Sequence, residues 1–214
     1  MRVEDYAQAL RRNLGVDAVA VGIPLIFPLP QIPRPVSSTL RLVYVGRFDN
    51  KQKRVDRLLT ACAELPRGHT WSLQLIGDGA DKQELRRMAA QLGIEDNCTW
   101  FGWHSDPWSQ IAEGSVLCFP SDYEGFGAVI IESMARGLPV LATDCDYGPR
   151  SLIVSGRNGW LTARTQEAFT DGLLQIAAHP DLIPDARSVS RTVDEFSLER
   201  VADRFLAVCQ KVVH

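Results

Sequence analysis

Hydrophobic positions along most of the chain follow two patterns, short continuous runs and longer stretches with helical spacing. The continuous runs predict buried strands over residues 40–45, 71–76, 98–101, 116–119, 140–143 and 159–161. Helical spacing between and after these runs predicts helices over residues 55–65, 81–92, 129–136, 166–178 and 198–213. Strands that alternate with helices indicate an α/β fold, a doubly wound parallel sheet with helices on both faces.

The N-terminal 37 residues depart from this alternation. Apolar spacing predicts one amphipathic helix over residues 3–14, and a short apolar run predicts a strand over residues 18–23. Five of the chain's 12 prolines follow within 12 positions and predict an extended, semi-rigid linker: Pro24, Pro28, Pro30, Pro33 and Pro35. One helix and one strand make no domain of their own, so they resemble the end of a preceding domain.

Composition and charge narrow the class of protein. The chain has 214 residues, with 23 basic and 26 acidic side chains, and the net charge of −3 disfavours a dedicated nucleic-acid-binding protein. Five scattered cysteines without CxxC spacing argue against a disulfide framework or a zinc site and favour a reducing compartment. The most apolar stretch, residues 19–35, is broken by prolines, so it predicts no membrane-spanning helix. We therefore expect a cytoplasmic protein, with a peripheral membrane contact still open.

Ligands of such sheets bind where the strands end and the loops into the helices begin. The loop after the first predicted strand runs from Gly46 to Arg54 and contains four cations, among them Arg47, Lys51 and Lys53. A cation cluster at this position suits a phosphate-bearing ligand, because arginine offers a fork of donors and lysine a point charge. A solvated basic loop is the alternative interpretation.

The next two loops give weaker signals. Gly77 and Gly79 follow the second strand, but Lys82 stands where the third glycine of a dinucleotide fingerprint is required, so only a tight turn remains. Three of the five tryptophans lie within residues 100–108, where an exposed ring suits base stacking. The alternative is that most of these rings pack against the strand end, and that His104 is a structural histidine.

The fourth loop carries the most specific pattern. Gly125 and Gly127 bracket the start of a predicted helix, whose free N–H groups and dipole make an anion site. Glu124 lies before this site and Glu132 lies on the helix after it. Carboxylates accept hydrogen bonds from sugar hydroxyls, and Glu132 needs a partner because it sits among apolar residues. A capping or structural carboxylate is the alternative for Glu132.

The segment SDYEGFGAVIIESMARGLPVLAT, with its E-x7-E spacing from Glu124 to Glu132, resembles the retaining GT-B glycosyltransferases of family 4, which use nucleotide-sugar donors. The first loop also matches, as do LQLIGDGADKQELRRMAAQLGI and CTWFGWHSDP, so the resemblance covers about residues 38 to 210. The segments TDCDYGPRSLIVSGRNGWL and CTWFGWHSDPW are similar to bacterial lipopolysaccharide-core hexosyltransferases, especially those that use UDP-galactose. The resemblance implies one Rossmann-like half of a GT-B fold.

The resemblance also implies roles for the cations and carboxylates. Arg47 and Lys53 are expected to neutralise the donor diphosphate, which is the leaving group. Counting from Gly46-Arg47 favours Lys51 as this lysine, whereas the downstream Val-Asp-x-Leu-Leu pattern selects Lys53, which we take. Glu132 is expected to bind the ribose and Glu124 the hydroxyls of the donor sugar.

The remaining implied contacts come from the backbone and from the aromatic loop. The backbone N–H groups of Phe126 and Gly127, next to Gly125, are expected to add to diphosphate binding. The base is expected beside residues 102–104, next to Trp103 and His104. The glycines at the strand ends, Gly46, Gly77 and Gly102, are expected to permit close approach of the ligand. Members of this family generally need no metal, so the resemblance implies no metal and no cofactor apart from the nucleotide-sugar substrate.

Members of this family place the acceptor in a separate N-terminal domain. We therefore expect residues 1–37 to be the end of such a domain and its linker, 38–195 the donor-binding domain and 196–214 a crossover helix. A glycan or lipid-linked acceptor would then bind through a domain missing from this chain, which alone would bind donor and transfer little. The alternatives are a non-catalytic nucleotide-sugar-binding module or subunit that needs a partner and, more weakly, another GT-B enzyme such as a sugar-nucleotide epimerase.

Overall fold

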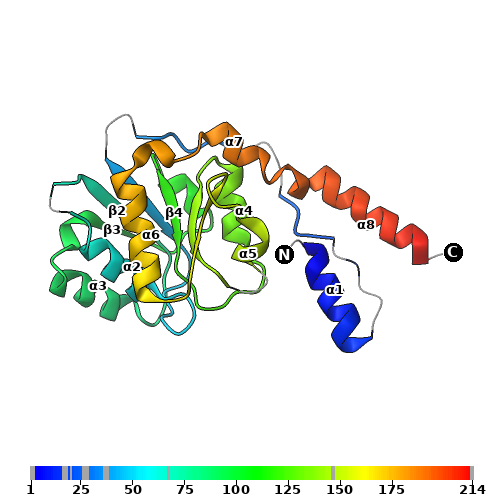
Figure 1. The fold of residues 1–214 in the computed structure, drawn as a ribbon, viewed down its shortest axis with the longest axis horizontal. Coiled ribbons are helices and arrows are strands. Elements are labelled where there is room, and N and C mark those ends of the chain that lie inside the picture. The colour runs from blue at the N-terminus through cyan, green and yellow to red at the C-terminus, as the bar shows by residue number, and fades with distance from the viewer. Residues whose placement is uncertain are drawn as a thin grey trace.

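A six-stranded parallel sheet forms the centre of the computed structural model, which describes residues 3–15, 19, 21–25, 29–35, 39–66, 68–145 and 148–212 (Figure 1). The strand order in this part of the chain is β3-β2-β1-β4-β5-β6. The strands are β1 (Leu40–Val45), β2 (Trp71–Ile76), β3 (Cys98–Gly102), β4 (Val116–Phe119), β5 (Val140–Thr143) and β6 (Gly159–Thr162). The predicted doubly wound sheet is confirmed, with β3 and β6 each one residue longer than the apolar pattern indicated.

Helices cover both faces of this sheet. The predicted helices are present as α1 (Val3–Leu14), α2 (Val55–Ala63), α3 (Lys82–Gln91), α4 (Ala128–Ala135), α6 (Gln166–Ala178) and α8 (Leu198–Val212). Two short helices, α5 (Pro149–Leu152) and α7 (Ala186–Arg191), were not predicted. The side chain of Asp185 caps α7 by accepting a hydrogen bond from the Ser188 N–H, at 2.9 Å.

The core is divided by the sheet into two apolar clusters. In β1, Leu42 and Tyr44 pack with the α2, α3 and α6 side, whereas Val43 and Val45 pack with the α4 side. Both faces of the strand are therefore buried, which explains why its sequence is a continuous apolar run rather than an alternating one.

Residues 29–35 of the proline-rich segment pack against the α4 side of the sheet. Ile32 is buried in that core. Arg34 donates hydrogen bonds to the backbone carbonyls of Ser115, Gly137 and Pro184. Burial lowers the pKa of Arg34 to about 10. This segment forms neither helix nor strand, and these contacts fasten it to the domain.

The strand predicted over residues 18–23 does not form at residues 19 and 21–23, and residues 18 and 20 lie outside the described part. Leu25 instead makes an isolated bridge with Ser197, just before α8. The Leu25 N–H donates to the carbonyl of Phe196 at 2.8 Å. Figure 1 shows α8 running away from the sheet, with α1 on the same side of the molecule. None of the helices in the described residues is both long and apolar enough to cross a membrane.

Candidate functional site

The loops that follow β1, β2, β3 and β4 meet at the carboxyl edge of the sheet, because all the strands are parallel. The chain moves outward from β1 in one direction to β2 and β3 and in the other to β4, β5 and β6. Ligands of open α/β sheets bind in the crevice at such a switch point. The predicted site residues lie on both sides of it.

Gly46 and Gly77 bring two of these loops into direct contact. Gly77 has a φ of 149°, and a Cβ atom built there would lie 1.9 Å from the carbonyl oxygen of Gly46. The Gly77 N–H donates to the Gly102 carbonyl at 2.7 Å, which adds the β3 loop. No side chain fits at residue 77, because the Gly77 backbone packs directly against the Gly46 backbone.

A cavity of about 360 Å³ opens next to these three glycine-containing loops. It is lined by Val45, Gly46, Arg47, Ile76, Gly77, Asp78, Trp103, His104 and Pro107. Trp103 is 72% exposed, whereas Trp108 is buried and Trp100 packs edge-on against Phe48. Two of the three clustered tryptophans therefore support the fold, and Trp103 presents its ring at the cavity with His104 beside it.

Lys53 and Glu124 form an ion pair across the switch point. The distance from Lys53 Nζ to Glu124 Oε1 is 2.7 Å, and the two side chains are only 18% and 7% exposed. Lys53 Nζ also lies 5.5 Å from the centre of the Phe119 ring. Lys51 is exposed, and its ammonium group makes no hydrogen bond or ion pair to a described residue. Of the two candidate lysines, Lys53 is the one that points into the site.

Arg47 lies at the rim of the cavity and keeps most of its guanidinium in solvent. Its side chain is 63% exposed and donates to Gln52 Oε1 at 3.1 Å. Gln52 in turn donates to the carbonyl of Tyr123 at 3.2 Å. Gln52 was not predicted as a site residue, yet it connects the cation loop to the loop that carries Glu124.

The start of α4 follows Glu124 in the chain, and its first backbone N–H groups have no partner among the described residues. Gly127 has a φ of 76° and caps the helix without a side chain. The N–H groups of Phe126, Gly127, Ala128 and Val129 donate to no other described residue. Gly125 has no atom within 4 Å of a built Cβ, so it leaves this edge open. Free N–H groups at a helix N-terminus attract anions such as phosphate.

Glu132 has the partner that its apolar surroundings require. Its Oε2 accepts a hydrogen bond of 2.8 Å from the indole N–H of Trp108. Arg136 stacks on the Trp108 ring, with the guanidinium carbon 4.8 Å from the ring centre. Glu132 Oε1 makes no hydrogen bond to a described residue. The carboxylate is thus held in one orientation, with one oxygen left to accept from a ligand.

Sequence reasoning missed a network that joins the two sides of the site. Asp122 Oδ2 pairs with Arg54 and Asp122 Oδ1 with Arg57, each at 2.8 Å. Although burial acts in the opposite direction, hydrogen bonds from these two arginines hold the pKa of Asp122 below its usual value. Arg54 is the one non-glycine residue with positive φ among those described, at 49°. The network therefore holds strained backbone directly after Lys53.

Two further features bear on the chemistry of the described residues. No three histidine, cysteine or acidic side chains among them are grouped to hold a metal ion. Burial raises the pKa of the Cys62 and Cys118 thiols, which suits core residues rather than nucleophiles.

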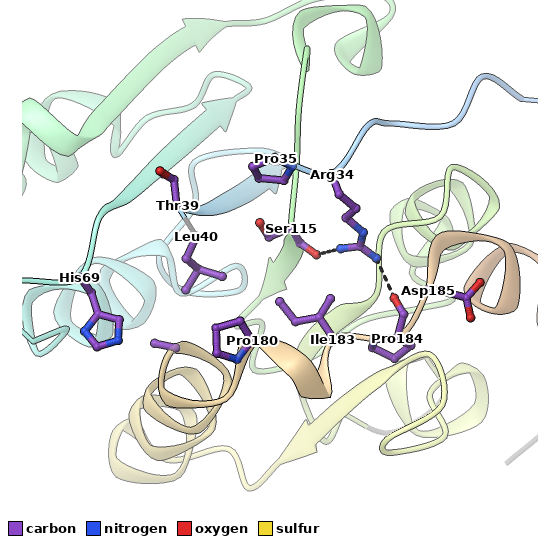
Figure 2. Close-up of a pocket in the computed structure, with 11 residues that line it drawn as sticks. Arg34, Pro35, Thr39, Leu40, His69, Ser115, Pro180, Ile183, Pro184 and Asp185 are labelled. Atoms are coloured by element: carbon purple, nitrogen blue, oxygen red, sulfur yellow. Dashed lines mark hydrogen bonds between the residues drawn. The ribbon is translucent and has the colours of Figure 1, made fainter. Parts of the chain in front are cut away.

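A second cavity, of about 240 Å³, lies at the opposite, amino edge of the sheet (Figure 2). Its wall is largely apolar, with Leu40, Pro180 and Ile183 drawn around it. Figure 2 shows Arg34 turned toward the carbonyls of Ser115 and Pro184. Its terminal nitrogens are therefore used by the fold, and the carboxyl edge is the better candidate site.

Comparison with known proteins identifies the family to which the sequence around this site is similar. The family model described as glycosyl transferases group 1 matches residues 30–191. That range contains all six strands and every residue of the candidate site.

Two curated relatives carry the name lipopolysaccharide 1,6-galactosyltransferase. The protein from Salmonella typhimurium is 36% identical over 142 residues, which are 64% of this chain and 38% of that protein. The protein from Escherichia coli K12 is 30% identical over 179 residues, 81% of this chain and 49% of that protein. The chain thus spans half or less of the length of these relatives.

A solved structure with the same fold is the lipopolysaccharide outer core galactosyltransferase WaaB in its apo form. The TM-score is 0.83 at 29% sequence identity, over 91% of this chain and 56% of that one.

Proposed function

The chain belongs to the group 1 glycosyltransferases, and from that premise we propose that it is the donor-binding domain of a hexosyltransferase that uses a UDP-sugar. The proposed reaction is retaining transfer of a hexose to a glycan or lipid-linked acceptor in lipopolysaccharide or polysaccharide synthesis. Two relatives named as lipopolysaccharide galactosyltransferases support this direction.

The observation that carries the proposal is the gathering of complementary groups at one edge of the sheet. A cavity beside Trp103 and His104 suits the base. Lys53 and the free N–H groups at the start of α4 suit a diphosphate. Glu132, held by Trp108, has one oxygen left for a ribose hydroxyl. These groups come from three loops and one helix, and the loops all follow strands at the carboxyl edge of the sheet, where ligands of such sheets bind.

In the proposed mechanism the bond between the anomeric carbon and the diphosphate oxygen breaks, and the electron pair leaves with the diphosphate. Lys53, Arg47 and the N–H groups of Phe126 and Gly127 stabilise the negative charge that develops on this leaving group. The anomeric centre becomes oxocarbenium-like and is then captured by the acceptor hydroxyl on the same face, and the hydroxyl proton passes to the departing diphosphate oxygen. Because positive side chains and backbone donors face the diphosphate, we expect the donor to bind without a metal.

Acceptor binding is proposed to need a second domain. The two lipopolysaccharide galactosyltransferase relatives are each more than twice as long as the segment that matches this chain. We propose that the domain works in the cytoplasm as part of an enzyme with a peripheral membrane contact, and that these 214 residues alone bind donor and transfer little.

Calorimetric titration with UDP in the presence of EDTA tests the proposed donor site. We expect heat of binding for UDP and for UDP-galactose, with weaker binding of GDP and ADP. EDTA removes divalent ions, so binding under these conditions also tests the expectation that no metal is needed. Absence of binding to every nucleoside diphosphate would contradict the proposed function.

A further inference from the structure

The ion pair between Lys53 and Glu124 joins two residues to which the proposed function gives different ligands. Lys53 is assigned to the diphosphate and Glu124 to the sugar hydroxyls. In the structure each is the other's partner, at 2.7 Å. A donor diphosphate therefore has to draw on an ammonium group whose charge Glu124 already neutralises.

From this geometry we propose that Glu124 competes with the diphosphate for Lys53, so that the site selects an intact nucleotide sugar over a free nucleoside diphosphate. The inference rests on the proposed function of the site. A free nucleoside diphosphate takes Lys53 and brings nothing for Glu124, whose side chain is only 7% exposed. A buried carboxylate without a partner is costly. A nucleotide sugar brings hydroxyl donors for Glu124 together with the diphosphate, so it avoids that cost.

The two loops cannot relieve this cost by moving apart, because other contacts fasten them. Arg54 directly follows Lys53, and Asp122 lies two positions before Glu124; their side chains pair at 2.8 Å. The Asp122 N–H also donates to the Gln52 carbonyl at 2.8 Å. These contacts stay in place when Lys53 turns to a ligand. Glu124 is therefore kept at the site and has to find a new partner there.

The same competition acts on the products. Once the hexose has left for the acceptor, the nucleoside diphosphate remains on Lys53 while Glu124 has lost its hydroxyl partners. Re-formation of the Lys53–Glu124 pair then favours release of the nucleoside diphosphate. The proposal therefore gives Glu124 a role in specificity and product release in addition to its expected contact with the donor sugar.

The test is a double-mutant cycle on the whole chain, measured by calorimetry with UDP, inorganic pyrophosphate and UDP-galactose. Glu124→Gln removes the competing charge and keeps the size of the side chain. We expect the Glu124→Gln chain to bind UDP and pyrophosphate about tenfold more tightly, because these ligands no longer have to break the partly buried ion pair with Lys53. UDP-galactose should gain less, so its advantage over UDP should shrink. In a Lys53→Met background the same substitution should change affinity for pyrophosphate by less than about twofold.

Asp144→Asn is the matched control, because it removes one negative charge at the same sheet edge from a carboxylate paired with Arg150. It should leave UDP affinity within about twofold. Equal gains from Glu124→Gln with and without Lys53, or an equal gain from Asp144→Asn, would overturn the proposal in favour of simple charge repulsion. Tighter binding of UDP-galactose in step with UDP would also overturn it.

Circular dichroism checks that each variant is folded, and Glu124→Ala serves as a second variant with the same expected direction. UDP binding that is unchanged in both Glu124 variants would overturn the competition and leave the donor site standing. Failure of UDP, UDP-galactose and pyrophosphate to bind any variant would refute the proposed function, and the inference with it.

Discussion

Replacing Asp122 with asparagine probes the network that holds the two halves of the candidate site together. Asp122 lies between Arg54 and Arg57, with an oxygen 2.8 Å from each guanidinium. Arg57 is 3% exposed in its side chain and also donates to the Pro120 carbonyl at 2.7 Å. The asparagine variant leaves this buried guanidinium without its carboxylate.

The expected loss of stability follows from how buried each partner is. Removal of one partner from a fully buried pair costs about 3–5 kcal/mol, whereas a surface pair contributes about 0–1 kcal/mol. The Asp122 and Arg54 side chains are 32% and 28% exposed, so this network lies between the two limits. The asparagine oxygen also still accepts one hydrogen bond. We therefore expect Asp122→Asn to lower the free energy of unfolding by about 2 kcal/mol.

Urea denaturation at pH 7 measures this difference, with Asp144→Asn as the control. Asp144 makes a two-pronged pair with Arg150 at 2.7 and 2.8 Å. The two aspartate side chains are similarly exposed, at 33% and 32%, but Arg150 is 45% exposed whereas Arg57 is 3% exposed. The loss of the Asp144 pair should therefore cost less than about 1 kcal/mol. A cost for Asp122→Asn no greater than that of the control would refute the reasoning.

The pH dependence of the same comparison supplies an independent check. The arginines lower the pKa of Asp122 from its usual value of 3.8. A carboxylate whose pKa is lower in the folded state stabilises the fold above its ordinary pKa, and this contribution is lost as the pH falls through the lowered value. The stability gap between the wild-type chain and Asp122→Asn should therefore be constant above pH 5 and shrink in the acid range. A gap that stays constant down to pH 2 would contradict the assigned ion pairs.

Two further substitutions test the assignment of the lysine and of the glycine turn. Lys53→Ala should weaken UDP binding at least about tenfold more than Lys51→Ala, because only Lys53 points into the site, and calorimetry showing the reverse order would select Lys51. Gly77→Ala should lower the free energy of unfolding by more than about 2 kcal/mol, because its Cβ would lie 1.9 Å from a backbone oxygen. Gly125→Ala, which meets nothing within 4 Å, should change the melting temperature little, and equal effects of the two alanines would contradict the close approach.

The strands β1, β4 and β5 at the centre of the sheet were predictable because each is a short, largely apolar run that is buried almost throughout. Val116–Phe119 and Val140–Thr143 are buried throughout, and Thr143 at the end of its strand is the one polar residue in the two sequences. The run over residues 18–23 is equally apolar, yet its described residues form no strand. A strand also needs a neighbouring strand to pair with, which apolar composition alone does not supply. In this part of the chain the structure has only an isolated bridge between Leu25 and Ser197 among the described residues.

The candidate site was predictable in its residue types and less so in its contacts. The glycines and carboxylates occupy fixed positions after strands, so the loop pattern locates them. The pairing of Asp122 with Arg54 and Arg57 joins residues 68 and 65 positions apart, and no periodicity reports such a pair. The same holds for the Trp108 indole on Glu132, since its direction depends on how the 3₁₀ turn Pro107–Gln110 packs against α4.

A crystal structure of the chain with bound UDP tests the central claim most directly. The account predicts the diphosphate between Lys53 and the N–H groups of Phe126 and Gly127, with the uracil in the cavity beside Trp103. Lys53 should then be separated from Glu124, with which it forms an ion pair of 2.7 Å in the structure described above. A nucleotide bound elsewhere, or at this edge with the Lys53–Glu124 pair intact, would contradict the account.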